Sequence, residues 1–196
     1  VMGQGGWNRR GDAPGSQYPA PFTLKVNGRE LFARGSNWVP PSIFYSSVPD
    51  AQIEALLRMA AGANMNLLRV WGGGPPAPQR FYELCDELGI MVWQEFPLAC
   101  NRYEGTPEYL EDLRDGAPAI VESLVSHPSV VLWCGGNELF CPWSRMTEQD
   151  EALKELERTV RRADPRNTPF IKTSPIAGVG HGHYVFRSET GTDAWN

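Results

Sequence analysis

Four groups of polar and aromatic residues each follow a short apolar run, and their types are those that a catalytic or binding site uses. The groups are Asn37-Trp38, Arg69 with Trp71, Gln94-Glu95 and Asn137-Glu138. Carboxyl groups can transfer protons, while amide, guanidinium and aromatic groups can bind and orient a polar ligand. We therefore interpret the four groups as parts of one candidate site.

Glu138 is the strongest candidate for proton transfer. It follows the apolar run 130–134 and the pair Gly135-Gly136, with Asn137 directly before it. A carboxyl held beside aromatic rings has its charged form disfavoured. A carboxyl that keeps its proton can act as the general acid of glycosidic cleavage. The alternative is that Glu138 only caps the following loop, and the residues alone leave both interpretations open.

The elements that must position these residues begin with a β-hairpin, after which strand and helix signals alternate. Asn27-Gly28 between two short alternating runs is typical of a type I′ turn. We expect strands at Leu31–Gly35, Asn66–Trp71, Ile90–Trp93 and Val130–Cys134, and weaker ones at 170–172 and 184–186. Helices are expected to begin at a capping box over 47–50, at Pro78, at Thr106-Pro107 and at Thr147 with Asp150.

Repeated βα units predict an α/β protein, either a doubly wound sheet or a barrel. In a barrel all C-terminal strand ends converge on one mouth, whereas an open sheet collects them only where its strand order reverses. Because four successive strand ends carry candidate site residues, we expect a partial (β/α)8 TIM barrel of five to six βα units. The sequence contains no GxGxxG or Walker pattern, so a nucleotide-binding sheet is less favoured.

Composition limits the possible partners and compartments. The chain has 196 residues, of which 41% are hydrophobic and 21% charged, as in an ordinary globular domain. Its net charge of −5 argues against a nucleic-acid partner, and no apolar run suits a membrane helix.

The four cysteines form no CxxC pair, so we expect reduced, mostly buried thiols, no metal site and a cytoplasmic protein. Residues 1–21 are expected to be a flexible tail, and 22–196 a single domain.

Residues 22 to about 143 resemble the catalytic barrel of family 2 glycoside hydrolases, in the β-mannosidase branch. The resemblance is carried by NGRELFARGSNWVP (27–40), NLLRVWGGG (66–74), FYELCDELGIMVWQEF (81–96) and HPSVVLWCGGNE (127–138). It implies hydrolysis of β-linked glycosides with retention and without a cofactor. It also places the family's acid/base motif on Asn137 and Glu138, with Asn137 holding the sugar 2-hydroxyl.

The resemblance assigns supporting roles to further residues. Glu95 matches an acidic residue that orders the site, and Arg69 is expected to pair with Glu95 or Glu138, with binding of a sugar hydroxyl as the alternative. Trp71 either stacks on the sugar or fills the barrel core. Trp38, Trp143 and Tyr103 are expected in loops at the mouth, where each either contacts the sugar or, more commonly for such residues, packs within the protein. Further candidates for contact with the sugar are Asn37, after the first strand, and His183-Tyr184, which resembles a His-Tyr segment of the family.

Retention needs a second carboxylate about 5 Å from the first. Glu189 lies in the segment RSETG (187–191), which resembles the family's Ser-Glu nucleophile segment, although the favoured interpretation of residues 186–196 is a loop toward a seventh strand. A complete barrel takes about 250 residues, so the second hypothesis is a catalytically incomplete barrel that is structural or binds sugar. Its unpaired edges, expected at Leu31–Ala33 and at 170–172 or 184–186, predict a homodimer.

Overall fold

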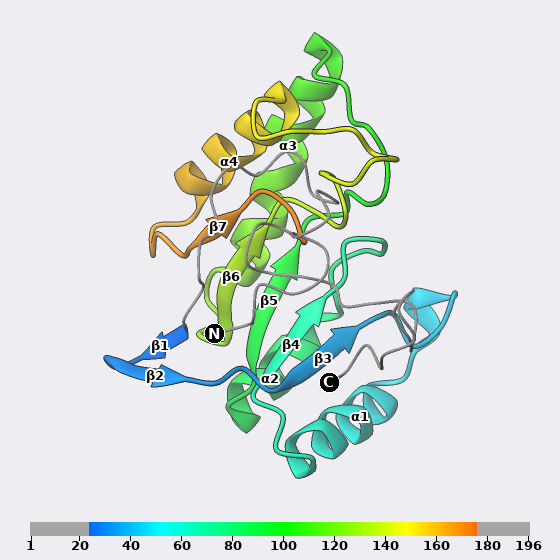
Figure 1. Ribbon diagram of the computed structural model, residues 1–196. Helices are drawn as coiled ribbons and strands as arrows, with labels where there is room; N and C mark the ends of the chain where they lie inside the picture. Colours follow the sequence, from blue (N-terminus) through cyan, green and yellow to red (C-terminus); the bar gives the residue numbers. More distant parts are fainter. Residues whose placement is uncertain (1–23, 176–196) are drawn as a thin grey trace, which may run out of the picture.

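A five-stranded parallel sheet forms the centre of the chain in the computed structural model, which describes residues 24–175 (Figure 1). Its order is β3-β4-β5-β6-β7, so each strand lies beside its neighbour in sequence. The strands are β3 Gly35–Trp38, β4 Leu67–Val70, β5 Met91–Glu95, β6 Val130–Cys134 and β7 Phe170–Ile171. The helices between them are α1 Asp50–Gly62, α2 Gln79–Leu88, α3 Pro107–Leu124 and α4 Glu151–Ala163. Consecutive parallel βα units of this kind make an α/β partial barrel, as predicted.

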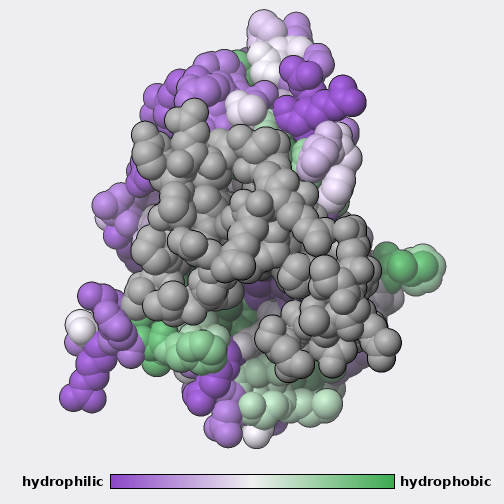
Figure 2. All heavy atoms as spheres, in the orientation of Figure 1, coloured by the Kyte–Doolittle hydropathy of each residue, from purple (hydrophilic) through white to green (hydrophobic). Residues whose placement is uncertain are grey.

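One large apolar cluster joins the sheet to the helices. It contains Leu57 of α1, Phe81 of α2 and Val121 of α3 together with strand residues such as Val92 and Trp133, all fully buried. Because side chains alternate along a strand, the residues between these point to the other face of the sheet, which is the inner face of the barrel. The outer surfaces of α3 and α4 are strongly hydrophilic (Figure 2).

The predicted hairpin precedes the barrel strands. It consists of β1 Leu24–Val26 and β2 Arg29–Leu31, which pair antiparallel. Asn27 and Gly28 have φ angles of 50° and 77°, and a type I′ turn requires both to be positive. The hairpin prediction is confirmed.

The first barrel strand was predicted at Leu31–Gly35, and this is wrong, because the strand is Gly35–Trp38. Leu31 ends the hairpin, and Phe32 is 75% exposed in the link to the barrel. Except for Trp38, the residues of β3 are exposed and carry no apolar signal. The apolar run 31–33 therefore marked the connection instead of the strand.

The predicted helix starts are confirmed at two positions and corrected at the capping box. α2 follows Pro78, and α3 follows Thr106, whose Oγ1 accepts a hydrogen bond from the backbone N–H of Tyr109 at 3.3 Å. The expected capping box is absent because the Ser47 hydroxyl donates to the Phe44 carbonyl within a 3-10 turn. α1 then begins at Asp50 without a side-chain cap.

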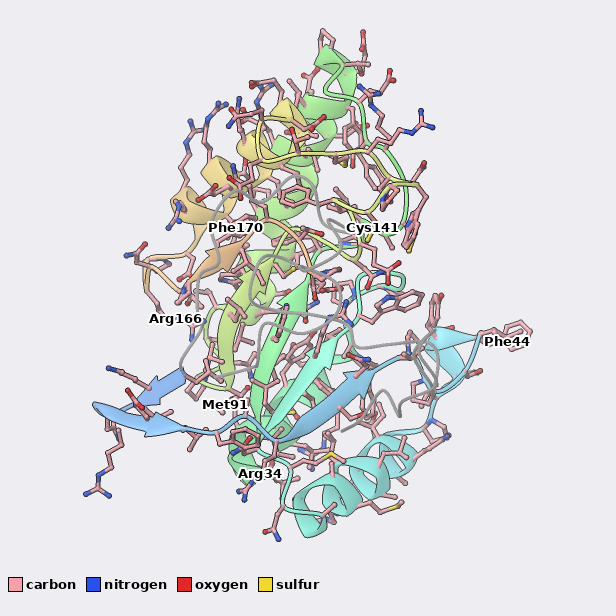
Figure 3. All side chains as sticks on the ribbon, in the orientation of Figure 1. Arg34, Phe44, Met91, Cys141, Arg166 and Phe170 are labelled. Carbon is pink, nitrogen blue, oxygen red and sulfur yellow. The ribbon has the colours of Figure 1, made fainter. Side chains whose placement is uncertain are left out.

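The loop between β3 and α1 presents apolar side chains to solvent. Val39 is 53%, Ile43 83% and Phe44 69% exposed. Phe44 points away from the body of the molecule (Figure 3), and apolar atoms project at the same place in the surface view (Figure 2). This loop lies directly after β3, which has a sheet neighbour on one side only among residues 24–175.

All four cysteines lie in the described part of the chain and are free thiols. Cys85, Cys134 and Cys141 are buried, and burial raises the pKa of Cys85 to about 12, with Asp86 adding to the effect. Cys100 is exposed. Within residues 24–175 no group of three or more His, Cys, Asp and Glu residues could hold a metal ion, and no helix is long and apolar enough to cross a bilayer. The division at residue 21 and the cellular compartment stay predictions.

Candidate active site

Arg69 and Glu95 form an ion pair on the inner face of the sheet, near the carboxyl ends of β4 and β5. Arg69 Nε donates to Glu95 Oε1 at 2.8 Å, and Nη2 donates to Oε2 at 2.9 Å. Arg69 is 8% exposed and Glu95 1%. Two parallel bonds between a guanidinium and a carboxylate fix both side chains in one plane. Arg69 was expected either to form an ion pair or to bind a sugar hydroxyl, and in the structure it forms the ion pair with Glu95.

The same guanidinium reaches two asparagines on neighbouring segments. Nη1 donates to Asn37 Oδ1 at 3.0 Å, and Nη2 also donates to Asn137 Oδ1 at 2.6 Å. Asn37 lies on β3, opposite Arg69 in the strand register, and Asn137 follows β6. One side chain therefore connects the ends of four successive strands, which is the convergence that the sequence predicted.

Glu95 has no oxygen left for proton transfer. Its Oε2 also accepts from the backbone N–H of Gly72 at 2.8 Å, and Oε1 accepts from the Cys134 thiol at 3.5 Å. Burial raises the pKa of the Glu95 carboxyl, and the charge and hydrogen bonds of Arg69 act in the opposite direction. With both oxygens engaged and the side chain buried, Glu95 is held in one fixed position.

The segment that carries Asn137 and Glu138 is held by its backbone on both sides. Asn137 makes isolated parallel bridges to Ala99 and to Ser174, which resume the sheet beyond the ends of β5, β6 and β7. Its N–H donates to the Leu98 carbonyl at 2.8 Å. Glu138 has a φ of 57°, a region that residues other than glycine enter rarely and that is concentrated at functional sites.

Gly135 and Gly136 permit this close approach of the segment to its neighbours. A Cβ at Gly135 would lie 2.3 Å from the Lys172 carbonyl oxygen, and one at Gly136 would lie 2.3 Å from that of Leu98. No other residue fits at these distances without moving backbone. The glycine pair therefore places the following two residues at the mouth and is more than a flexible link.

Asn137 and Glu138 lie together through a third side chain, Cys100. The Asn137 Nδ2 donates to the Cys100 sulfur at 3.2 Å, and the thiol donates to Glu138 Oε2 at 3.5 Å. Asn137 is 4% exposed, whereas Glu138 is half-buried and can reach solvent at the mouth. Cys100 was not among the predicted site residues, because the cysteines were expected to be mostly buried structural thiols and the loop after the third strand carried no motif that pointed to the site.

The aromatic candidates divide into two sets. Trp71 is half-buried beside the site and lies close to Gly73, where a Cβ would meet its ring at 2.0 Å. Trp143 is 52% exposed in the loop after β6. Trp38 was predicted in a loop at the mouth, and this placement is wrong, but its alternative role in packing is correct: it ends β3 with its ring 4.6 Å from that of Phe81 in the core. Asn37 points inward, so the next residue along the strand must point to the helices.

Three predicted site residues lie outside the described part of the chain. They are the sugar-contact candidates His183 and Tyr184 and the nucleophile candidate Glu189. The weak strand expected at 184–186 and the tail at 1–21 lie outside it as well. The other candidates are all described, and Arg69, Glu95, Asn37, Asn137 and Glu138 form one connected group.

Comparison with known proteins agrees with this geometry. Residues 23–171 match the family described as "Glycosyl hydrolases family 2, TIM barrel domain". The β-mannosidases of Rattus norvegicus and Bos taurus are 41% and 46% identical over 171 residues, which is 81% of this chain. The crystal structure of a β-D-mannosidase from Dictyoglomus thermophilum is 37% identical, with a TM-score of 0.71 over 79% of this chain and 20% of that one.

Each of these matches covers most of this chain but only a small part of the relative. The chain spans about a fifth of the length of the curated relatives, 19% for the rat protein and 20% for the bovine one. The match nevertheless includes the whole described sheet and the segment with Asn137 and Glu138. On the family match, the sequence identity and the shared fold, this chain belongs to glycosyl hydrolase family 2 and contains part of its TIM-barrel domain.

Proposed function

We propose that this chain provides the acid/base half of a retaining β-glycosidase that acts on β-mannosides. Glu138 would give its proton to the leaving-group oxygen in the first step and take a proton from water in the second. Asn137 would hold the sugar 2-hydroxyl beside it. The substrate class comes from the names of the relatives, which are β-mannosidases.

The observation that carries this proposal is the anchoring of Asn137 by Arg69 beside a half-buried carboxyl. The Nη2–Oδ1 distance is 2.6 Å, and Arg69 is itself fixed by the buried Glu95. A site that must hold substrate to within about half an ångström needs such support behind the residues that touch it. Glu138 supplies the proton, and the network behind Asn137 supplies the orientation.

The nucleophile must come from a residue other than Glu95, whose oxygens are occupied by Arg69, Gly72 and Cys134. Glu189 is our candidate, on its Ser-Glu segment alone. A retaining pair would have carboxyl groups about 5–5.5 Å apart. Substitution of Glu189 by Gln tests this assignment, because loss of the nucleophile abolishes formation of the glycosyl-enzyme.

A nitrophenyl β-mannoside assay tests the role of Glu138. We expect Glu138→Gln to abolish steady-state turnover, and azide to restore it by forming a β-configured mannosyl azide. Azide attacks the glycosyl-enzyme without needing a general base, so rescue identifies the lost group as the acid/base. Glu104→Gln, at an exposed position in the loop after β5, is the matched control. Turnover by Glu138→Gln equal to wild type, without azide, would refute the assignment.

A second function is supported by the open edges of the sheet. Among residues 24–175, β3 pairs only with β4, and β7 pairs only with β6. Exposed edges and apolar patches are normally covered, and a second copy of the chain is the simplest cover. We therefore propose, as the alternative, a structural or sugar-binding partial barrel that forms a homodimer. The edge predicted at Leu31–Ala33 is replaced here by β3 with the adjacent Ile43 and Phe44.

Light scattering at micromolar concentration distinguishes this alternative. We expect a mass of twice 21.8 kDa for the wild-type chain. Ile43→Asp should shift the mass toward the monomer, because it places a charge on the proposed interface. Met59→Asp, at a 68% exposed position on α1, is the control and should leave the mass unchanged. A folded wild-type monomer of 21.8 kDa would refute the homodimer.

A further inference from the structure

Cys100 is placed by the backbone directly against the Asn137-Glu138 segment. Its N–H donates to the Asn137 carbonyl at 2.9 Å, next to the bridge between Ala99 and Asn137. The residue has a φ of 51°, the left-handed region that Glu138 also occupies. Two non-glycine residues in this conformation therefore face each other at the mouth of the barrel, and strained backbone of this kind is found where a functional geometry requires it.

The Cys100 thiol connects the two family motif residues. It accepts a hydrogen bond from Asn137 Nδ2 at 3.2 Å and donates one to Glu138 Oε2 at 3.5 Å. The other end of the Asn137 amide, Oδ1, accepts from Arg69 at 2.6 Å. The guanidinium can only donate, so the amide oxygen must face Arg69 and the amide nitrogen must face the sulfur. The thiol thus completes the orientation of Asn137 and reaches Glu138.

The thiol is suited to this task because it stays protonated. Partial desolvation of the sulfur raises its pKa, the hydrogen bond from Asn137 lowers it, and the carboxylates of Glu138 and Glu95 raise it further, for a net increase. A protonated thiol donates to a carboxylate, whereas a thiolate would repel it. Cys100 is also the one cysteine of the four that is exposed, so reagents can reach it.

We infer that Cys100 is a positioning residue of the proposed hydrolytic site, whose thiol holds the Asn137 amide and the Glu138 carboxyl in a fixed relative orientation. The catalytic consequence rests on the proposed function of Glu138. The contact between the Cys100 thiol and the Glu138 carboxylate does not rest on that proposed function, so it can be tested without turnover.

The first experiment measures the rate at which iodoacetamide alkylates the native chain as a function of pH. The thiolate displaces iodide, and the thiol proton is released to solvent, so the rate reports the ionisation of Cys100. We expect Glu138→Gln to raise the rate several-fold near pH 8, because it removes a neighbouring negative charge, and Glu104→Gln to leave it unchanged. Equal rates in wild type and Glu138→Gln, or a label that peptide mass spectrometry finds first on another cysteine, would overturn the inference.

The second experiment compares the pH profiles of kcat/KM for Cys100→Ala and Cys100→Ser on a nitrophenyl β-mannoside. We expect about a tenfold loss and a displaced alkaline limb for Cys100→Ala, because Glu138 must be protonated in the first step, and recovery of most of the rate in Cys100→Ser, whose hydroxyl can make both hydrogen bonds. A profile of Cys100→Ala identical to wild type would overturn the inference. A chain without turnover would refute the proposed function alone, and the alkylation rates would then decide the inference.

Discussion

Arg69 Nη2 lies 2.6 Å from Asn137 Oδ1, although the two residues are separated by 68 positions in the sequence. This bond joins β4 to the segment after β6 and passes over β5, whose Glu95 accepts hydrogen bonds from the same Nη2 and from Nε. The orientation of the proposed substrate-binding amide therefore depends on a charge pair two strands away. The site is therefore built from side chains on the inner face of several strands and not from a single loop.

Arg69→Met should destabilise the fold strongly. It leaves the Glu95 carboxylate buried without its partner, and removal of one member of a buried ion pair costs about 3–5 kcal/mol. Urea unfolding followed by tryptophan fluorescence measures the loss of free energy of unfolding. The double variant Arg69→Met with Glu95→Gln should recover part of it, because no uncompensated charge remains. Equal stability of wild type and Arg69→Met would contradict the ion-pair account.

Asp86 should make stability depend on acid pH. Burial raises the pKa of its carboxyl, but hydrogen bonds from Ser129 and His127 outweigh burial and hold the pKa below its ordinary value. The stabilisation is therefore complete above the unfolded pKa of about 4 and is lost as the pH falls through the lower folded value.

Asp86→Asn tests this by urea unfolding at neutral pH and between pH 4 and pH 2. We expect the variant to be less stable than wild type at neutral pH and the difference to shrink in acid. Asp115→Asn, at an exposed position on α3, is the control and should parallel wild type throughout. A difference that stays constant with pH would show that the carboxylate charge does not contribute.

Two glycine-to-alanine substitutions should act in opposite directions. Gly135→Ala places a Cβ 2.3 Å from the Lys172 carbonyl oxygen, so it should displace the Asn137-Glu138 segment and lower stability. Gly116→Ala lies inside α3 with no atom within 4 Å of the new Cβ, and it should stabilise by about 0.5–1 kcal/mol. Thermal unfolding of both variants measures the two effects, and a stabilising Gly135→Ala would contradict the close approach.

Trp143→Ala should weaken binding of a mannoside without changing stability. The ring is 52% exposed in the loop after β6, so its removal exposes little core. If it stacks on the sugar, KM should rise several-fold with a smaller change in kcat, because stacking helps ground state and transition state alike. Trp38→Phe is the contrasting variant, since Trp38 packs on Phe81 and its change should affect stability first. An unchanged KM in Trp143→Ala would show that Trp143 does not contact the sugar.

The sequence predicted the βα order and the polar strand ends because both follow from short-range patterns. Val130–Cys134 is a continuous apolar run that forms β6, and α2 begins after Pro78 as predicted. Errors arose where tertiary context decides. Trp38 was assigned to the mouth by its neighbour in sequence, but strand alternation sends it into the core. Cys100 reaches Asn137 and Glu138 only through the bridge at Ala99, a long-range pairing that no local pattern encodes.

The sequential strand order has a consequence for how the chain acquires its structure during synthesis. Each strand pairs with the one made just before it, so the sheet can grow strand by strand as the chain emerges. The bond from Arg69 to Asn137 is the exception. At about 5–20 residues per second, the 68 residues from position 70 to Asn137 take roughly 3 to 14 seconds to add. The ribosome therefore releases β4 well before its arginine meets the asparagine that it orients, so β3, β4 and β5 can pair before the chemistry of the mouth is assembled on them.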